Sequence, residues 1–466
     1  MNLLIRKNIY WIIPLPLILN FFYNLVNSES YFNNLPINFF EIFTLTLGLI
    51  LFLIIGKFIS DIFKLNSYSL GIVYFLISFF IFDNLLLIFL KEATYNFSFY
   101  LVLSLWTIAF LFKLEYKKIT FLGAYYFFQQ FINKLILGKL FLNLNTNGDV
   151  EAVWLPTTKN IYENNYFYSL IFSPEQGYGQ LIPHIQASTY KLLYNFENYN
   201  YLLSTSRIFF ILTIVFLLEL NISKESKTFL VITYCILILN NTFWSYLFLD
   251  SLMAEAISSY LFLVLTLNIT QKISDSNNVK STSLTFLFFI YGYLYLSKQF
   301  FSTFVILVIF LILFKKRYRK EASFGLFCLL LNLVNYKFLL PTIRMDSHLS
   351  QIDIADTIFD LILFRNLNLN NIVLITENIY IDKPLTYVLV VFLSFAVYVV
   401  LKKKVNVEIS LPMLIFSLLN IFLVLILYIS AWRDMELESP VRFIVTFILF
   451  KLIFIFKEIE ILKKTI

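Results

Sequence analysis

Charged side chains are scarce in this chain: Asp, Glu, Lys and Arg make up only 14% of its 466 residues. Apolar residues make up 59%, aromatic residues 19%, and the mean hydropathy is +0.79. Soluble globular domains carry about 25% charged residues. This composition therefore excludes an ordinary soluble domain and predicts a membrane protein with many spans.

Cysteine and histidine are also rare. Cys235 and Cys328 both lie in apolar runs, so the sequence supports neither a disulfide framework nor a thiolate metal site. His184 and His348 are far apart and show no metal-ligand spacing, and we interpret both as structural or solvated residues. No Pro-rich or Gly-rich linker divides the chain.

Long apolar stretches dominate what remains. A helix needs about 20 apolar residues to cross the hydrocarbon core of a bilayer. Stretches that meet or approach this length predict an all-α polytopic integral membrane protein with about fourteen transmembrane helices. They lie at 8–27, 40–63, 68–90, 96–114, 119–138, 206–222, 228–246, 251–270, 283–298, 299–314, 323–340, 385–402, 409–430 and 437–456. The pair at 283–314 can also form one long kinked element.

Lys and Arg residues fall in alternate connections of this arrangement. Because cytoplasmic loops carry an excess of Lys and Arg, these connections and both termini are predicted to be cytoplasmic. The two long connections, 139–205 and 341–384, are then external, which means periplasmic in a Gram-negative bacterium. Residues 1–118 form a predicted accessory set of transmembrane helices ahead of the first long loop. Lys451 lies inside the last apolar run, and we expect it to snorkel toward the cytoplasmic interface.

Ionisable residues at the external face are where chemistry is expected, because charge against a bilayer is costly and seldom kept without a partner. Four clusters qualify. They are Asp149, Glu151, Trp154 and Lys159 in the first long loop, Asp250 and Glu255 opening a helix in FLDSLMAEA, Lys298 in GYLYLSKQF, and Arg433 and Arg442 in AWRDMELESPVRF.

Each cluster also has an ordinary structural explanation. Asp250 is suited to cap a helix, Lys298 to anchor a helix end at the interface, and Trp154 to join an aromatic belt. Asp149 and Glu151 fit solvated loop acids. All four clusters lie on one side of the predicted membrane, which favours a shared functional site.

The residue types in these clusters suit one kind of chemistry. Carboxylates remove a proton from an acceptor hydroxyl or bind a divalent metal. Lys and Arg hold a phosphate through charge-assisted hydrogen bonds. Together they suit transfer of a group from a membrane-embedded lipid phosphate. Soluble nucleotide donors fit poorly, because they are cytoplasmic.

In chain order, the acidic loop motif, LDSLMAEA, YGYLYLSKQFF and SPVRF resemble the GT-C superfamily of polyprenyl-phosphate-dependent glycosyltransferases. The similarity is closest to the branch of protein mannosyltransferases and aminoarabinose transferases, and it covers roughly residues 119–450. It implies a GT-C-like catalytic region over 119–466, a polyprenyl-phosphate sugar donor, and a lipid, glycan or protein acceptor. We expect contacts with membrane lipids, none with nucleic acid, and a location in the bacterial inner membrane.

The resemblance also implies roles for single residues. Asp149 matches the catalytic loop acid of an inverting transfer, with Glu151 as a second member, and Asp250 matches the acid of the later helix. Lys298 matches the lysine near the donor phosphate. Arg442 and Arg433 join Lys298 as predicted donor-phosphate ligands, and Glu255, Trp154 and Lys159 join Asp250 as predicted substrate-binding residues. A divalent metal at Asp149 or Glu151 is left open as a cofactor.

Two alternatives stay open. A polysaccharide polymerase or ligase would use the loop 341–384, with Arg344, His348 and Arg365. A lipid-linked sugar flippase or transporter would have a similar number of spans, but such proteins often show internal repeats and polar residues near the bilayer midplane. Here the charges gather at one face.

Overall fold

The computed structural model describes residues 39–90, 94–136, 155–163, 181–193, 204–250, 254–274, 281–294, 319–334, 369–402, 410–430 and 439–463. They form 17 α-helices and one π-helical turn, and these ranges contain no strand, which confirms the all-α class for them. In chain order the elements are α3 (Phe39–Phe63), α4 (Tyr68–Leu90), α5 (Tyr95–Lys113), α6 (Tyr116–Ile136), α7 (Leu155–Tyr162), α9 (Leu181–Leu193), α10 (Ser204–Glu219), α11 (Lys224–Asn240), α12 (Thr242–Ser245), the π-helical turn η4 (Tyr246–Asp250), α13 (Ala254–Ser274), α14 (Ser281–Tyr293), α16 (Arg319–Val334), α18 (Leu369–Ile381), α19 (Lys383–Lys402), α20 (Ser410–Ser430), α21 (Ser439–Thr446) and α22 (Ile448–Lys463).

Four helices in the described ranges are long and apolar enough to cross a membrane, as expected of an integral membrane protein. These spans are Phe43–Phe63, Tyr68–Leu86, Tyr95–Lys113 and Lys383–Leu401. Each coincides with a predicted span. The described ranges therefore show fewer than the predicted fourteen or so spans. Some of the remaining predicted spans lie outside the described ranges. The rest are helices that are too short, too polar or described over too short a stretch to meet the length and hydropathy required of a span.

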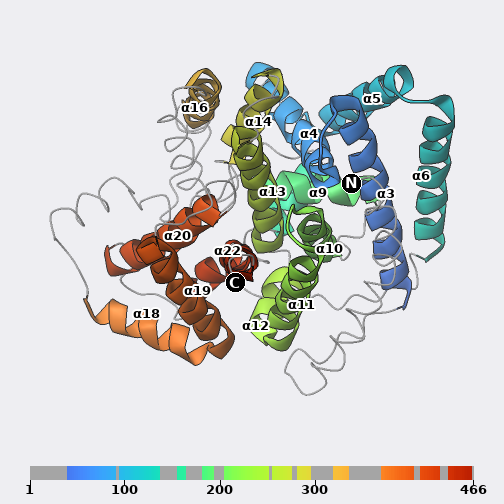
Figure 1. Cartoon of the computed structure of the whole chain (residues 1–466). Coiled ribbons are helices and arrows are strands. Elements are labelled where there is room, and N and C mark those ends of the chain that lie inside the picture. The colour runs from blue at the N-terminus through green and yellow to red at the C-terminus, as the bar shows by residue number, and fades with distance from the viewer. Residues whose placement is uncertain are drawn as a thin grey trace.

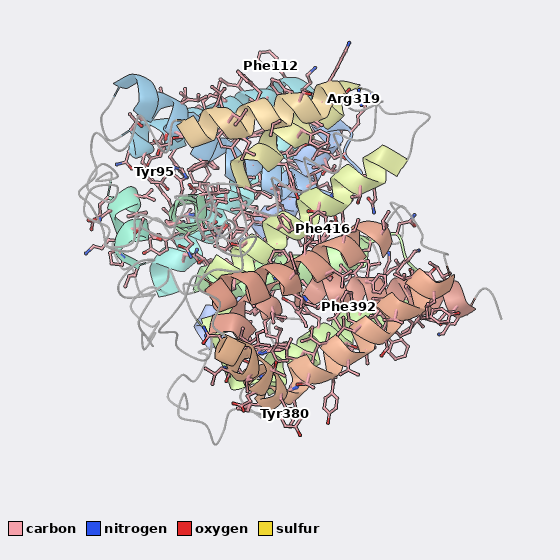
Figure 2. All side chains as sticks on the ribbon, turned by 90° about the vertical axis from the view of Figure 1, so that its left-hand side faces the viewer. Tyr95, Phe112, Arg319, Tyr380, Phe392 and Phe416 are labelled. Atoms are coloured by element: carbon pink, nitrogen blue, oxygen red, sulfur yellow. The ribbon has the colours of Figure 1, made fainter. Side chains whose placement is uncertain are left out.

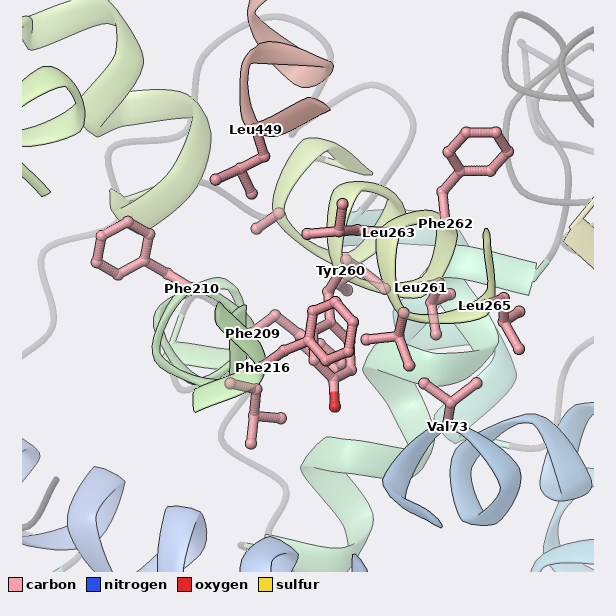
Figure 3. Packing of buried hydrophobic residues seen from close by; sticks show 14 of the residues in the cluster. Val73, Phe209, Phe210, Phe216, Tyr260, Leu261, Phe262, Leu263, Leu265 and Leu449 are labelled. Carbon is pink, nitrogen blue, oxygen red and sulfur yellow. The ribbon is translucent and has the colours of Figure 1, made fainter. Parts of the chain in front are cut away.

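Helix α13 lies at the centre of the bundle, between α3 to α6 on one side and α18 to α22 on the other (Figure 1). It packs on α10, where the ring centroids of Phe209 and Tyr260 are 5.7 Å apart (Figure 3). The Tyr260 hydroxyl also donates to the Ser69 carbonyl of α4 at 3.2 Å. Phe262 packs against Phe447, between α21 and α22, with ring centroids 5.4 Å apart. Helix α13 therefore joins the two halves of the bundle.

Helices α3 and α4 approach closely at two glycines. A Cβ at Gly71 would overlap the carbonyl oxygen of Gly56, and a Cβ at Gly56 would meet the carbonyl oxygen of Tyr68. Small residues allow the backbones of membrane helices to come this close. These glycines therefore set the spacing of the first two described spans.

The two long connections predicted as external loops contain helices. Connection 139–205 holds α7 and α9, and connection 341–384 holds α18. All 13 residues of α9 are buried, although its sequence LIPHIQASTYKLL includes His, Gln, Ser, Thr and Lys. It packs on α4 and α7. Part of the first long connection therefore belongs to the interior of the bundle.

Lys451 does not snorkel to the cytoplasmic interface. Its side chain in α22 is fully buried, and its ammonium donates to the Asn420 side-chain oxygen of α20 at 2.9 Å. The predicted snorkelling is therefore wrong, because a polar partner on a neighbouring helix satisfies the lysine inside the bundle.

Candidate functional site

Asp83 is the only charged residue of α4, and it lies at the centre of a buried polar cluster. Its Oδ1 accepts hydrogen bonds from the hydroxyls of Thr94 and Ser98, both at 2.8 Å. Its Oδ2 lies 3.0 Å from Nε2 of His184, and both side chains are only 1% exposed. A buried carboxylate is costly unless it is paired and hydrogen-bonded. Here the hydrogen bonds come from Ser98 of α5, from Thr94 at the N-terminal cap of α5 and from His184 of α9.

The hydrogen-bond chain continues on the other side of the imidazole. With the proton on Nε2, His184 Nδ1 accepts from the Ser188 hydroxyl at 3.4 Å, and Ser188 Oγ accepts from the Tyr95 hydroxyl at 3.5 Å. The ring of Tyr95 packs edge-on against the imidazole, with centroids 5.1 Å apart. We call Asp83, Thr94, Ser98, His184 and Ser188 the Asp83 cluster.

Carboxylate, imidazole and hydroxyl follow one another here in the order used for nucleophilic catalysis. Ser188, however, is 1% exposed, and Asp83 is fully buried. A nucleophile must contact its substrate, and this burial prevents that. The Asp83 cluster therefore ties α4, α5 and α9 together. His184 has the structural role predicted for it, and the alternative of a solvated side chain is wrong.

Helix α9 is also held from α6 and α7. The last carbonyls of a helix lack partners within the helix, and here the Gln130 amide donates to Leu192 O at 2.8 Å while the Asn133 amide donates to Leu193 O at 2.6 Å. From α7, the Thr158 hydroxyl donates to the Gln186 side-chain oxygen at 2.8 Å. Counting α4 and α5, four neighbouring helices therefore fix the position of α9.

Lys191 lies near the end of α9, among aromatic rings. Its ammonium donates to the side-chain oxygen of Asn96 and lies 5.0, 5.0, 4.9 and 5.8 Å from the ring centroids of Tyr95, Phe99, Tyr100 and Tyr162. Each such cation–π contact contributes about 0.5 to 2 kcal/mol. We call Lys191, Asn96 and these four aromatic residues the Lys191 cluster.

Replacing Lys191 by Met is expected to flatten the dependence of stability on alkaline pH. Burial lowers the pKa of the Lys191 ammonium to about 8, whereas an unfolded chain keeps a lysine pKa of about 10.4. Between these values the unfolded state binds more protons, so the free energy of unfolding of the unsubstituted protein rises as pH increases. Thermal melts in detergent from about pH 7 to about pH 10 measure this rise. It should be smaller in Lys191→Met but unchanged in Lys159→Met; parallel curves for Lys191→Met and the unsubstituted protein would contradict the prediction.

Most of the residues predicted to do chemistry fall outside the described ranges. They are Asp149, Glu151, Trp154, Lys298 and Arg433, together with Arg344, His348 and Arg365 of the alternative loop. Their roles stay predictions. Trp154 directly precedes α7, so the acidic loop leads into a helix that packs on α9.

Four predicted residues lie in described helices. Lys159 of α7 forms an ion pair with Glu163 at 3.8 Å and is exposed. Glu255 lies in the first turn of α13, as predicted, and is buried. Asp250 is the last residue of η4, and α13 begins at Ala254; residues 251–253 between them lie outside the described ranges. Arg442 lies in α21.

The elements that carry these four residues meet around α13. Helix α13 packs on η4, α21 and α9, and α9 in turn packs on α7. One turn after Glu255, the Ser259 hydroxyl donates to the Thr446 carbonyl at the end of α21, at 2.8 Å. The structure therefore brings together the helices that hold Asp250, Glu255 and Arg442, and links them through α9 to the helix that holds Lys159.

Three ionisable residues of this region were missed from the sequence. Arg207 of α10 donates from Nε to the carbonyl of Leu249, directly before Asp250, at 3.0 Å. The sequence did contain a signal for Asp83, because a lone carboxylate in a membrane helix predicts a polar or charged partner. Arg207 and Lys191 had none, because the partners they contact lie 42 and 95 residues away in sequence.

No metal site is found in the part of the chain that the structure describes, since no three His, Cys, Asp or Glu side chains gather there in a suitable geometry. The two carboxylates proposed as metal ligands, Asp149 and Glu151, lie outside that part. A metal bound to them is still an open alternative.

No family model, curated protein or solved structure matches this chain. The resemblance to a glycosyltransferase superfamily therefore rests on the residues quoted for it.

Proposed function

We propose that this chain is a membrane glycosyltransferase that moves a sugar from a polyprenyl-phosphate donor to a lipid, glycan or protein acceptor. The proposal includes about fourteen spans, cytoplasmic termini and a location in the bacterial inner membrane. The reaction takes place at the external face, which is the side predicted for both long connections. The GT-C-like arrangement covers residues 119–466, and residues 1–118 are accessory helices.

The observation that carries the proposal is the packing of the candidate-bearing elements. Motifs far apart in sequence, at residues 155–162, 246–250, 254–255 and 439–446, occupy helices that converge on α13 and α9. A one-sided enzyme needs such convergence, because its substrates meet at a single place. Arg207, beside the backbone of residue 249, adds a buried cation to this region.

The positions of three residues at opposite ends of the bundle support the proposed orientation of the chain in the membrane. Phe112 of α5 directly precedes the basic connection that begins at Lys113, and Arg319 belongs to the basic run at 315–320; both lie at one end of the molecule (Figure 2). Tyr380, from the connection 341–384, lies at the opposite end (Figure 2). This separation is what the positive-inside rule requires if the basic connections are cytoplasmic.

In the proposed reaction, the acceptor hydroxyl attacks the anomeric carbon of the sugar from the side opposite the phosphate. Asp149 takes the hydroxyl proton, while the bond from the anomeric carbon to the phosphate oxygen breaks with inversion. The polyprenyl phosphate leaves with the electron pair of that bond. Lys298, Arg442 and Arg433 stabilise its negative charge.

The test is a reconstituted assay with a labelled sugar on a polyprenyl phosphate. A transferase joins the label to the acceptor and releases unlabelled polyprenyl phosphate. Movement of label across the bilayer without release of the carrier lipid would instead assign transport. Mass spectrometry of lipids and glycans from a deletion strain identifies the acceptor, as the product missing from that strain.

A further inference from the structure

The Lys191 ammonium has more hydrogen-bonding capacity than its described neighbours use. An ammonium carries three N–H donors, and among the described residues only Asn96 accepts from it. Lys191 is only 6% exposed. Among the described residues, no carboxylate lies within ion-pair distance of its ammonium. A cation so placed is stabilised further by any anion that reaches it.

The position of this cation is fixed in advance. The Asp83 cluster and the amides of Gln130 and Asn133 hold α9 on either side of Lys191. Four aromatic rings from α5 and α7 surround the ammonium. A site held this rigidly loses little side-chain entropy when an anion binds.

The Lys191 cluster adjoins an apolar surface along α5. Phe97, Tyr100, Ile108 and Leu111 lie on one face of that helix and are between 48% and 60% exposed. Helix α5 is a candidate span, and only 28% of its apolar window is buried inside the protein. In a membrane, a face of this kind contacts acyl chains. Tyr100 belongs to this apolar face, and its ring centroid is 4.9 Å from the Lys191 ammonium. The face therefore adjoins the Lys191 cluster.

We propose that the Lys191 cluster binds the phosphate of a membrane lipid whose chains lie along the exposed face of α5. The ammonium donates to the phosphate oxygens, and the rings of Tyr100 and Tyr162 shield this contact from water. Charge-assisted hydrogen bonds of this kind are the strong ones. The proposal concerns lipid binding and does not depend on sugar transfer.

The test measures lipid retention by native mass spectrometry of the full-length protein in detergent. The probes are phosphatidylglycerol, diacylglycerol with the same acyl chains, and inorganic phosphate. Phosphatidylglycerol should bind the unsubstituted protein, and Lys191→Gln should weaken it about 10- to 100-fold. Lys118→Gln, at a partly exposed lysine of α6 paired with Glu115, is the matched control and should bind as the unsubstituted protein does.

Two further variants keep the test decisive if Lys191→Gln fails to fold. Lys191→Arg keeps the charge and should retain the lipid. Asn96→Asp supplies an internal carboxylate for the ammonium and should weaken binding of phosphatidylglycerol. Equal binding of diacylglycerol and phosphatidylglycerol would overturn the proposal, as would unchanged binding in Asn96→Asp. Displacement of the lipid by inorganic phosphate at similar concentration would overturn the assignment to a lipid.

Discussion

Replacing Asp149 by Asn is expected to lower the rate of sugar transfer about 10²- to 10⁴-fold. Asparagine has nearly the shape of aspartate but cannot accept the proton of the acceptor hydroxyl. In the proposed reaction Asp149 acts through its placement, because an ordinary aspartate is already ionised near neutral pH. Because the substitution removes a group needed in the transition state, it should lower kcat more than it raises KM. Initial rates with the labelled donor measure both constants.

The matched control for this substitution is Glu115→Gln. Glu115 is a carboxylate between α5 and α6, its side chain is 75% exposed, and its only described ion pair joins it to Lys118. It belongs to a connection predicted to be cytoplasmic, so transfer should be unchanged. Full activity in Asp149→Asn would overturn the role of Asp149. If Arg344→Ala lost activity at the same time, the loop 341–384 would become the active one, as in a polymerase or ligase.

The sequence predicts the long apolar helices well, and the physical reason is local. The predicted spans 40–63, 68–90 and 96–114 nearly coincide with α3, α4 and α5. A run of about 20 apolar residues without breaks forms a helix in a bilayer, whatever the rest of the chain does. Length alone does not show whether a shorter apolar helix crosses the membrane or is buried among other helices, so the number of spans is much less certain.

Helix α9 shows what the sequence could not reveal. Its polar residues suggested a solvated connection, yet all of them are buried and several have partners on other helices. His184 lies 101 residues from Asp83, and Thr158 lies 28 residues from Gln186. A polar side chain is equally suited to water and to a buried partner, and only the fold decides between them. For the same reason, the order of motifs indicated Glu255 but not Arg207 or Lys191.

Replacing Asp83 by Leu is expected to lower the free energy of unfolding by about 3 to 5 kcal/mol. The change removes the buried acceptor of the Thr94 hydroxyl and of the His184 N–H, whereas the Ser98 hydroxyl can still donate to the Tyr95 carbonyl at 2.9 Å. Each unpaired buried donor costs about 1 to 3 kcal/mol. Unfolding of the detergent-solubilised protein, followed by circular dichroism, measures the loss. Asp61→Leu, at an exposed aspartate of α3, should change stability by less than about 0.5 kcal/mol.

A double-mutant cycle separates the pair from a general loss of packing. If Asp83 and His184 stabilise each other, Asp83→Leu combined with His184→Leu should cost less than the sum of the two single changes, by about 1 to 3 kcal/mol. Additive costs would show that the two side chains act independently. Since the Asp83 cluster also fixes the helix that carries Lys191, Asp83→Leu should weaken retention of phosphatidylglycerol, whereas Asp149→Asn should leave it unchanged. The two substitutions thereby separate the architecture around α9 from the proposed chemistry of the acidic loop.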